Sequence, residues 1–275
     1  MVDMGAFVLP ALVVAVFGAP ALVLVWGGVW KYRIYRRLRR LEPTEPGVLS
    51  EGTSLVDGDA RALPDDGTVA APVTGTECVA YEFEIEVFME GTDGRGNWSN
   101  FDRTVVRPRF LLDGWTGDAV VDTEGFDLAL SEDYRCEVTG RDNAPPEVVS
   151  YVDDRGDLRL EASATVGPLE GTNETKVRFV ERRLEPGQEV RVVGYARPDA
   201  AALANAADAN ALVAKRELSG LRRWLGQPLV VTDRGESAAA TYQLGHAKRL
   251  IGIAVAWVGL LSLFLLVPVL NGVTG

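Results

Sequence analysis

Residues that usually carry catalysis or bind metals are scarce in this 275-residue chain. It has one histidine, His246, and two cysteines, Cys78 and Cys136, which lie far apart and form no C-x-x-C pair. The sequence also lacks a P-loop, a G-x-S-x-G elbow, a G-x-G-x-x-G turn that opens a helix, and an H-E-x-x-H pair. These absences argue against the common hydrolase, nucleotide-binding and zinc-dependent classes. We therefore expect no catalytic residue, no cofactor and no metal site.

Lysine is scarce as well, although arginine is plentiful, and the net charge is −11 with a sequence pI of about 4.7. The only lysines are Lys31, Lys176, Lys215 and Lys248. High net charge keeps proteins soluble, and molar salt screens charge repulsion within about 3 Å. The composition thus favours a halophilic archaeon that accumulates salt as the source. Because the central region has no basic stripe, we expect no nucleic-acid partner.

Two acidic clusters could bind a divalent cation through oxygen ligands. Neither has the spacing of an EF-hand, and in a chain this acidic we interpret them as solvated loop charges. Their members are Asp57, Asp59, Asp65 and Asp66 in the first cluster, and Asp153, Asp154 and Asp157 in the second.

Two long apolar runs lie at the ends of the chain. A membrane-spanning helix needs roughly 20 apolar residues, so residues 6–30 and 250–271 are each predicted to span a bilayer. A cleaved signal peptide is the alternative for the first run, but it requires positive charge before the apolar core. Here the positive charge follows the core.

Aromatic and basic residues flank both runs and predict their orientation. Tryptophan favours the headgroup region, and Lys/Arg near a span stay in the cytoplasm. We therefore expect a multi-pass protein of the cell membrane, with both termini outside and the central domain cytoplasmic. The basic stretch has a second interpretation, a specific lipid or nucleic-acid patch. The flanking residues are Trp26, Trp30, Lys31, Arg33, Arg36, Arg37, Arg39 and Arg40 at the first run, and Lys248 and Arg249 at the second.

Between the runs, residues 31–54 read as a basic juxtamembrane segment and linker, and residues 55–198 as a β domain. The strongest strand signal is the alternation from Val79 to Val87, with Glu82, Glu84 and Glu86 on the opposite face. It predicts one buried face and one acidic, solvated face.

Turn residues punctuate the rest of the predicted β domain. Asp113–Gly117 predicts a hairpin, and Pro186-Gly187 suits the centre of a type II turn. Shorter strands are predicted at 134–138, 148–152 and 158–162. The result is a mainly-β sandwich or small barrel between two transmembrane helices, followed at 199–249 by an Ala-rich helical segment that includes a helix over 200–225.

Three stretches in this order resemble the GIDE domain, also called the beside-a-membrane domain. They are residues 67–81 (GTVAAPVTGTECVAY), 110–121 (FLLDGWTGDAVV) and 181–194 (ERRLEPGQEVRVVG). The resemblance implies a domain that binds something near a membrane. The best-known members are mitochondrial-anchored ubiquitin and SUMO ligases with a C-terminal RING finger. A RING needs four Cys/His ligands at each of two zinc ions, and this chain, which ends at Gly275, has too few. We therefore do not expect ligase activity.

These observations predict a membrane-anchored binding or scaffold protein without a catalytic site of its own. Its expected partners are the lipid bilayer and a cytoplasmic or membrane protein. The predicted contact is Asp113 with Trp115 at the tip of its turn, unless Trp115 folds back as a hydrophobic plug. The alternative function is an E3-ligase-like component of a ubiquitin-like conjugation system whose catalytic part is on another chain.

The acidic composition generates the first test. We expect the domain to be folded in molar KCl and to lose structure in dilute buffer, because its repelling carboxylates are then no longer screened. Far-UV circular dichroism across a KCl series measures this. Equal stability at both ends of the series would contradict the halophilic interpretation.

Overall fold

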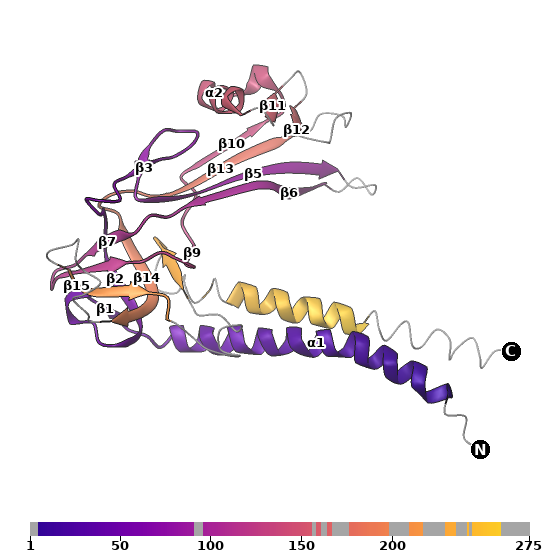
Figure 1. The fold of residues 1–275 in the computed structure, drawn as a ribbon. Helices are drawn as coiled ribbons and strands as arrows, with labels where there is room; N and C mark the ends of the chain where they lie inside the picture. Colours follow the sequence, from indigo (N-terminus) through magenta and orange to yellow (C-terminus); the bar gives the residue numbers. More distant parts are fainter. Residues whose placement is uncertain are drawn as a thin grey trace. The chain divides into compact units, whose positions relative to one another are not determined.

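The computed structural model describes residues 5–90, 96–155, 158–160, 164–166, 176–197, 209–216, 229–234, 241 and 244–259. The chain divides into two compact units. One holds residues 1–41, 217–228 and 237–275, and is helical where it is described. The other holds residues 42–216 and 229–236, and is mainly β (Figure 1).

A closed five-stranded barrel forms the first part of the β unit. Its strands pair in the order β2-β7-β8-β15-β14, and β14 pairs back onto β2 to close the ring. Only the β8–β15 pair is parallel among these. The bounds are β2 (Gly52–Ala62), β7 (Phe110–Asp113), β8 (Asp118–Val121), β14 (Glu189–Arg197) and β15 (Ala209–Ala214).

Short elements extend the barrel sheet on both sides. They are β1 (Pro43–Thr44), which pairs with β2, and β16 (Val230–Thr232) with β9 (Asp127–Leu128), which continue from β14. A 3-10 helix, η1 (Pro46–Val48), follows β1. Because β15 and β16 come after residue 198, the barrel draws on chain beyond the predicted end of the β domain.

Alternating apolar residues fill the barrel. Val56, Phe110, Leu112 and Val192 are fully buried in one core cluster, as expected when one face of each strand points inward. Gly194 is required there, because a Cβ at this position would lie 2.5 Å from the Val213 side chain.

A four-stranded antiparallel sheet forms the second part of the β unit, in the order β10-β13-β5-β6. Helix α2 packs on one face, where Val148 and Val152 meet Phe83 and Phe179. Tyr151 adds an edge-to-face contact with Phe83 at 5.1 Å between ring centroids. The bounds are β5 (Ala80–Glu90), β6 (Gly96–Val106), β10 (Tyr134–Val138), β13 (Val177–Leu184) and α2 (Pro146–Asp154).

Small elements border this sheet. They are β3 (Val69–Ala70) paired with β4 (Glu77–Cys78), β11 (Leu158–Leu160) paired with β12 (Ala164–Val166), and the 3-10 helix η2 (Arg141–Asn143).

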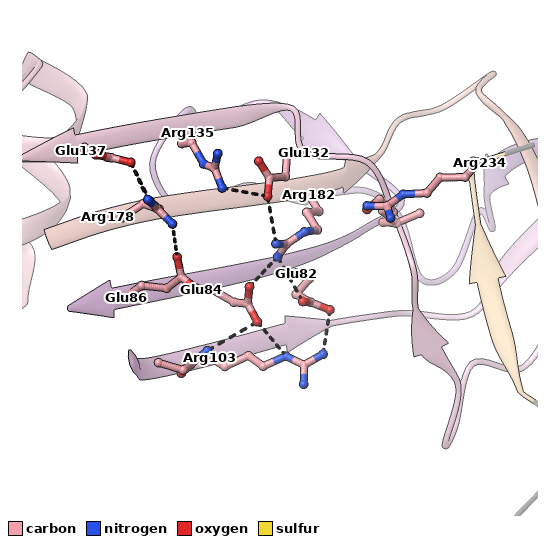
Figure 2. Close-up of polar contacts among 12 residues, drawn as sticks. Glu82, Glu84, Glu86, Arg103, Glu132, Arg135, Glu137, Arg178, Arg182 and Arg234 are labelled. Carbon is pink, nitrogen blue, oxygen red and sulfur yellow. Dashed lines mark hydrogen bonds and ion pairs between the residues drawn. The ribbon is translucent and has the colours of Figure 1, made fainter. Parts of the chain in front are cut away.

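The opposite face of the four-stranded sheet carries a ladder of ion pairs, not the acidic, solvated surface predicted from β5 (Figure 2). Arg182 lies 2.6 Å from Glu84 and 3.3 Å from Glu82. Arg178 lies 3.0 Å from Glu86 and 2.6 Å from Glu137. The register places Arg178 opposite Glu86 and Arg182 opposite Glu82. The prediction missed this because the balancing charges come from β13, about a hundred residues along the chain.

Two predicted turns are confirmed. Residues 114–117 connect β7 to β8 as an antiparallel hairpin. Glu185–Gln188 forms a turn in which Gln188 N–H donates to Glu185 C=O at 3.2 Å, and Gly187 has φ 82°, as position i+2 of a type II turn requires. This second turn joins β13 to β14, so it carries the chain from the four-stranded sheet into the barrel.

Two predicted elements are wrong. Residues 148–152 form part of α2 and not a strand, because Pro146 starts a helix whose apolar side chains recur every four residues. Residues 209–214 form β15 and not a helix, because pairing with β8 and β14 overrides the helix propensity of their alanines. Other parts of the predicted 200–225 helix lie outside the described residues.

The helical unit contains α1 (Gly5–Leu38) and a second helix over residues 244–259. Gly28 lets the two helices approach closely, since a Cβ there would lie 2.6 Å from the Ile251 side chain. Several large apolar side chains on these helices remain exposed, among them Leu22 and Val255.

The two predicted membrane spans are corrected by the structure. Within the residues that it describes, no helix combines the length and apolar character needed to cross a membrane. The basic residues that follow the first apolar run begin at Lys31, inside α1. The second helix contains Lys248 and Arg249, and residues 260–271 of the second predicted span lie outside the described residues.

The predictions that depended on these spans are corrected with them. They are the flanking transmembrane helices of the fold class, the multi-pass character, and the cell-membrane location with both termini outside and the domain cytoplasmic.

The ion-pair ladder generates a stability test. We expect Arg182→Ala to lower the free energy of unfolding by about 1.5–3 kcal/mol, because it removes a charge-assisted contact to Glu82, whose side chain is only 6% exposed and keeps Arg103 at 2.9 Å. The matched control is Arg141→Ala, which breaks a pair with Asp153 that is about half exposed on both sides. Its expected loss is much smaller, because exposed ion pairs contribute little to stability. Urea unfolding at one fixed KCl concentration measures both, and equal losses would contradict a structural role for the ladder.

Candidate functional site

Trp115 is the most exposed large apolar residue among those that the structure describes, with 99% of its surface open to solvent. It lies at the tip of the β7–β8 turn, as predicted. The alternative in which Trp115 folds back as a plug is therefore wrong. Burying a side chain of this size is worth about 1.5–3 kcal/mol, so this position forgoes a large contribution to folding.

The turn that presents Trp115 is tightly held. Gly47 N–H donates to the Thr116 hydroxyl at 3.2 Å, and Gly117 N–H donates to Gly114 C=O at 3.3 Å. Glycine is required at Gly58, since a Cβ there would lie 2.5 Å from the Asp113 carbonyl oxygen. The backbone under Trp115 is thus fixed, although its side chain is free.

A second contact fixes the same turn from the side of η1. A Cβ on Gly114 would lie 2.5 Å from the Pro46 ring, and one on Gly47 would lie 2.0 Å from the Thr116 carbonyl oxygen. Gly117, with φ 138°, adopts a backbone conformation that favours glycine. The D-G-W-T-G sequence therefore specifies a rigid support for one exposed aromatic ring.

A hollow of about 430 Å³ lies next to Trp115. The lining residues come from β1 and the residue after it, from β2, from the 113–115 turn that includes Trp115, and from the start of β14. Five carboxylates line it. We call this assembly the Trp115 surface: Trp115, Glu45, Asp57, Asp59, Asp113 and Glu189.

Strand register places three of these carboxylates in one row. Asp59 on β2 pairs directly with Glu189 on β14 and with Asp113 on β7. Residues directly opposite one another in antiparallel strands share a face, and like charges in such pairs are destabilising. The barrel thus carries an unfavourable row of negative charge at the hollow.

Two arginines offset part of this charge. Arg61 pairs with Asp113, and Arg191 lies 3.0 Å from Asp57 and 3.7 Å from Glu189. Among the residues that the structure describes, no ion pair engages Glu45 or Asp59. Negative charge therefore exceeds positive charge at the Trp115 surface.

Asp118, at the start of β8, adds to the acidity beside the turn. Burial raises the pKa of its carboxyl group, and the neighbouring Asp113 raises it further through a hydrogen bond and its charge. A hydrogen bond from the Gly114 backbone N–H acts in the opposite direction. The Asp118 carboxylate thus accepts a hydrogen bond from the turn, and its pKa depends on the charge of Asp113 in the hollow.

The chemistry of these groups suits binding of a cation. An aromatic face attracts cations, and carboxylates accept charge-assisted hydrogen bonds. Over the described part of the chain, no group of three or more His, Cys, Asp or Glu has the geometry of a metal site.

The two cysteines lie elsewhere. Burial raises the pKa of the Cys78 thiol to about 11 and also raises the pKa of Cys136. Because the thiolate is the nucleophile, both are poor nucleophiles at neutral pH.

The predicted membrane-flanking residues all belong to the helical unit, whereas the predicted contact residues Asp113 and Trp115 belong to the β unit. Trp26 is exposed, whereas the Trp30 indole N–H is buried without a hydrogen-bond partner in the described structure. The Arg37 side chain lies outside the description. The remaining basic residues are exposed or half-buried. Arg39 and Arg40 lie in the turn after α1, and the others lie on the two helices: Lys31, Arg33, Arg36, Lys248 and Arg249.

Sequence reasoning found Asp113 and Trp115 but missed Glu45 and Glu189, and it treated Asp57 and Asp59 as loop charges. Both aspartates lie on β2. The available signal was their i, i+2 spacing, which puts them on one face of a strand. Only the pairing of β2 with β14 and β7 shows which charges stand beside them.

Comparison of the chain with protein-family models, curated proteins and solved structures found no match.

Asp118 generates a pH test. An acid whose pKa is raised by folding stabilises the fold below its unfolded pKa, and this stability is lost as pH rises through the folded pKa. We therefore expect Asp118→Asn to be more stable than the parent protein at pH 7, with the difference shrinking as pH falls toward the ordinary aspartate value of 3.8.

Asp153→Asn is the matched control, because a hydrogen bond from Arg141 lowers the pKa of Asp153. It should show the opposite sign at pH 7. Thermal unfolding from pH 3.8 to 7 compares the two variants, and a parallel pH dependence would contradict the assignment.

Proposed function

We propose that this protein is a binding module that captures a partner protein through the Trp115 surface, without catalysing a reaction itself. The observation that carries the proposal is a fully exposed tryptophan on a backbone that cannot easily move. Exposed aromatic residues of this kind are the usual anchors of protein interfaces. A support that is already rigid lowers the entropy lost on binding.

Two features of the β unit agree with this proposal. The thiols are held protonated by burial, so they are not activated for catalysis. The four-stranded sheet uses its charges internally, since its glutamates are paired with arginines. The Trp115 surface differs from it in leaving both an aromatic ring and carboxylates available.

The resemblance to the GIDE domain supports the same class of function and remains a prediction. The alternative, a component of a ubiquitin-like conjugation system, also remains a prediction, because no contact among the described residues favours it.

Site-specific crosslinking tests the proposal. A photoreactive phenylalanine analogue in place of Trp115, in the full chain in its native cells, should trap one recurring protein that mass spectrometry identifies. The matched control places the same analogue at Met89, an exposed apolar residue of β5. Equal capture at both positions, or no capture at position 115, would contradict the proposal.

Trp115→Ala adds a quantitative arm. Loss of a hot-spot tryptophan costs about 2 kcal/mol or more, so we expect affinity for the trapped protein to fall about thirtyfold. Because the side chain is exposed, the free energy of unfolding should change by less than about 0.5 kcal/mol. A large loss of stability would instead assign Trp115 a structural role.

A further inference from the structure

We infer that the hollow beside Trp115 takes an arginine side chain from a basic segment of the partner protein. This inference rests on the proposed function and names the chemistry of the partner. Its first support is the charge imbalance. Asp59 lies in a row between Glu189 and Asp113; arginines pair with these two neighbours, but no ion pair among the described residues engages Asp59, and an incoming guanidinium group would offset this excess negative charge.

The second support is an equivalent arrangement elsewhere in the same chain. On the four-stranded sheet, the Arg178 guanidinium carbon lies 3.8 Å from the centre of the Trp98 ring. The same guanidinium group joins Glu86 and Glu137. One arginine thus stacks on an indole ring and bridges two carboxylates at once (Figure 2 shows its two ion pairs).

The Trp115 surface has the indole ring and the carboxylates of that arrangement. In the part of the chain that the structure describes, no arginine or lysine lies over the Trp115 ring. Trp98, which carries its arginine, is only partly exposed, whereas Trp115 is fully exposed. By analogy, Trp115 supplies the aromatic ring of such a stacked pair, and the partner protein supplies the arginine.

Arginine fits the hollow better than lysine. Its planar guanidinium group stacks on an aromatic face and forms forked hydrogen bonds with carboxylates, whereas an ammonium group is a compact point charge. Asp59 and Glu45, neither of them in an ion pair among the described residues, supply the acceptors. A volume of about 430 Å³ lies within the range of ordinary ligand pockets, which begins at about 300 Å³.

Peptide titration tests the inference. A labelled peptide of alternating glycine and arginine is titrated into the full chain, at the lowest KCl concentration that keeps it folded, and fluorescence anisotropy is measured. We expect saturable binding that weakens with added KCl, and no binding of the matched glycine–glutamate peptide. Binding of both peptides, or of neither, would overturn the inference.

Variants locate the binding. Asp59→Asn should weaken binding of the arginine peptide about tenfold, the value of one charge-assisted hydrogen bond. The matched control Glu124→Gln removes one exposed charge from the loop after β8, outside the hollow lining, and should leave affinity within about twofold. Equal losses in the two variants would reduce the effect to net charge and overturn the inference.

Two further arms complete the test. Asp59→Asn should not lower the melting temperature, because it relieves a like-charge row, so weaker binding is not attributable to unfolding. Spermidine that binds as tightly as the peptide, with the same dependence on Asp59, would make the hollow a general polyamine site and overturn the inference. If crosslinking at position 115 succeeds while Asp59→Asn leaves that capture unchanged, the inference fails and the proposed function stands.

Discussion

The pairing of β2 with β14 closes the barrel, and the Trp115 surface depends on that closure. Eight residue pairs join the two strands, from Glu189–Asp59 to Ala196–Gly52. On its other edge β2 pairs with β7 from Asp59 to Ala62, so Asp59 is the residue that both pairings share. Closure therefore fixes Gly58 against the turn and aligns Asp59 between two further carboxylates. A barrel with no free edge at this point has little freedom to relieve either constraint.

The β unit uses charge in two different ways. On the four-stranded sheet, arginines of β13 form ion pairs with the glutamates of β5, and the resulting ladder stabilises the fold. At the barrel, the register brings Asp59 beside Glu189 and Asp113, and the nearby arginines do not balance them. The same amino acids thus give a structural network in one place and an unbalanced surface in the other. That imbalance, together with the exposed ring of Trp115, is why we assign binding to the barrel and not to the sheet.

Local signals in the sequence predicted local structure well. Pro186-Gly187 and Asp113–Gly117 gave correct turns, because their geometry is set by the residues themselves. The period-2 pattern of β5 identified a strand, but it could not show that arginines of β13 would pair with the β5 glutamates. Residues 148–152 and 209–214 were misassigned because packing on the sheet and pairing in the barrel outweighed local preference. The candidate site divides in the same way. Trp115 was predictable from its turn, whereas the row through Asp59 required the strand order.

The proposed binding mode requires Trp115 to receive a cationic side chain from a partner. The most direct measurement is the NMR signal of its indole N–H, assigned with Trp115→Phe, during addition of the glycine–arginine peptide. We expect this signal to shift saturably, while the indole signal of Trp98, already stacked with Arg178, stays in place. An unmoved Trp115 signal, or equal shifts of both, would contradict it.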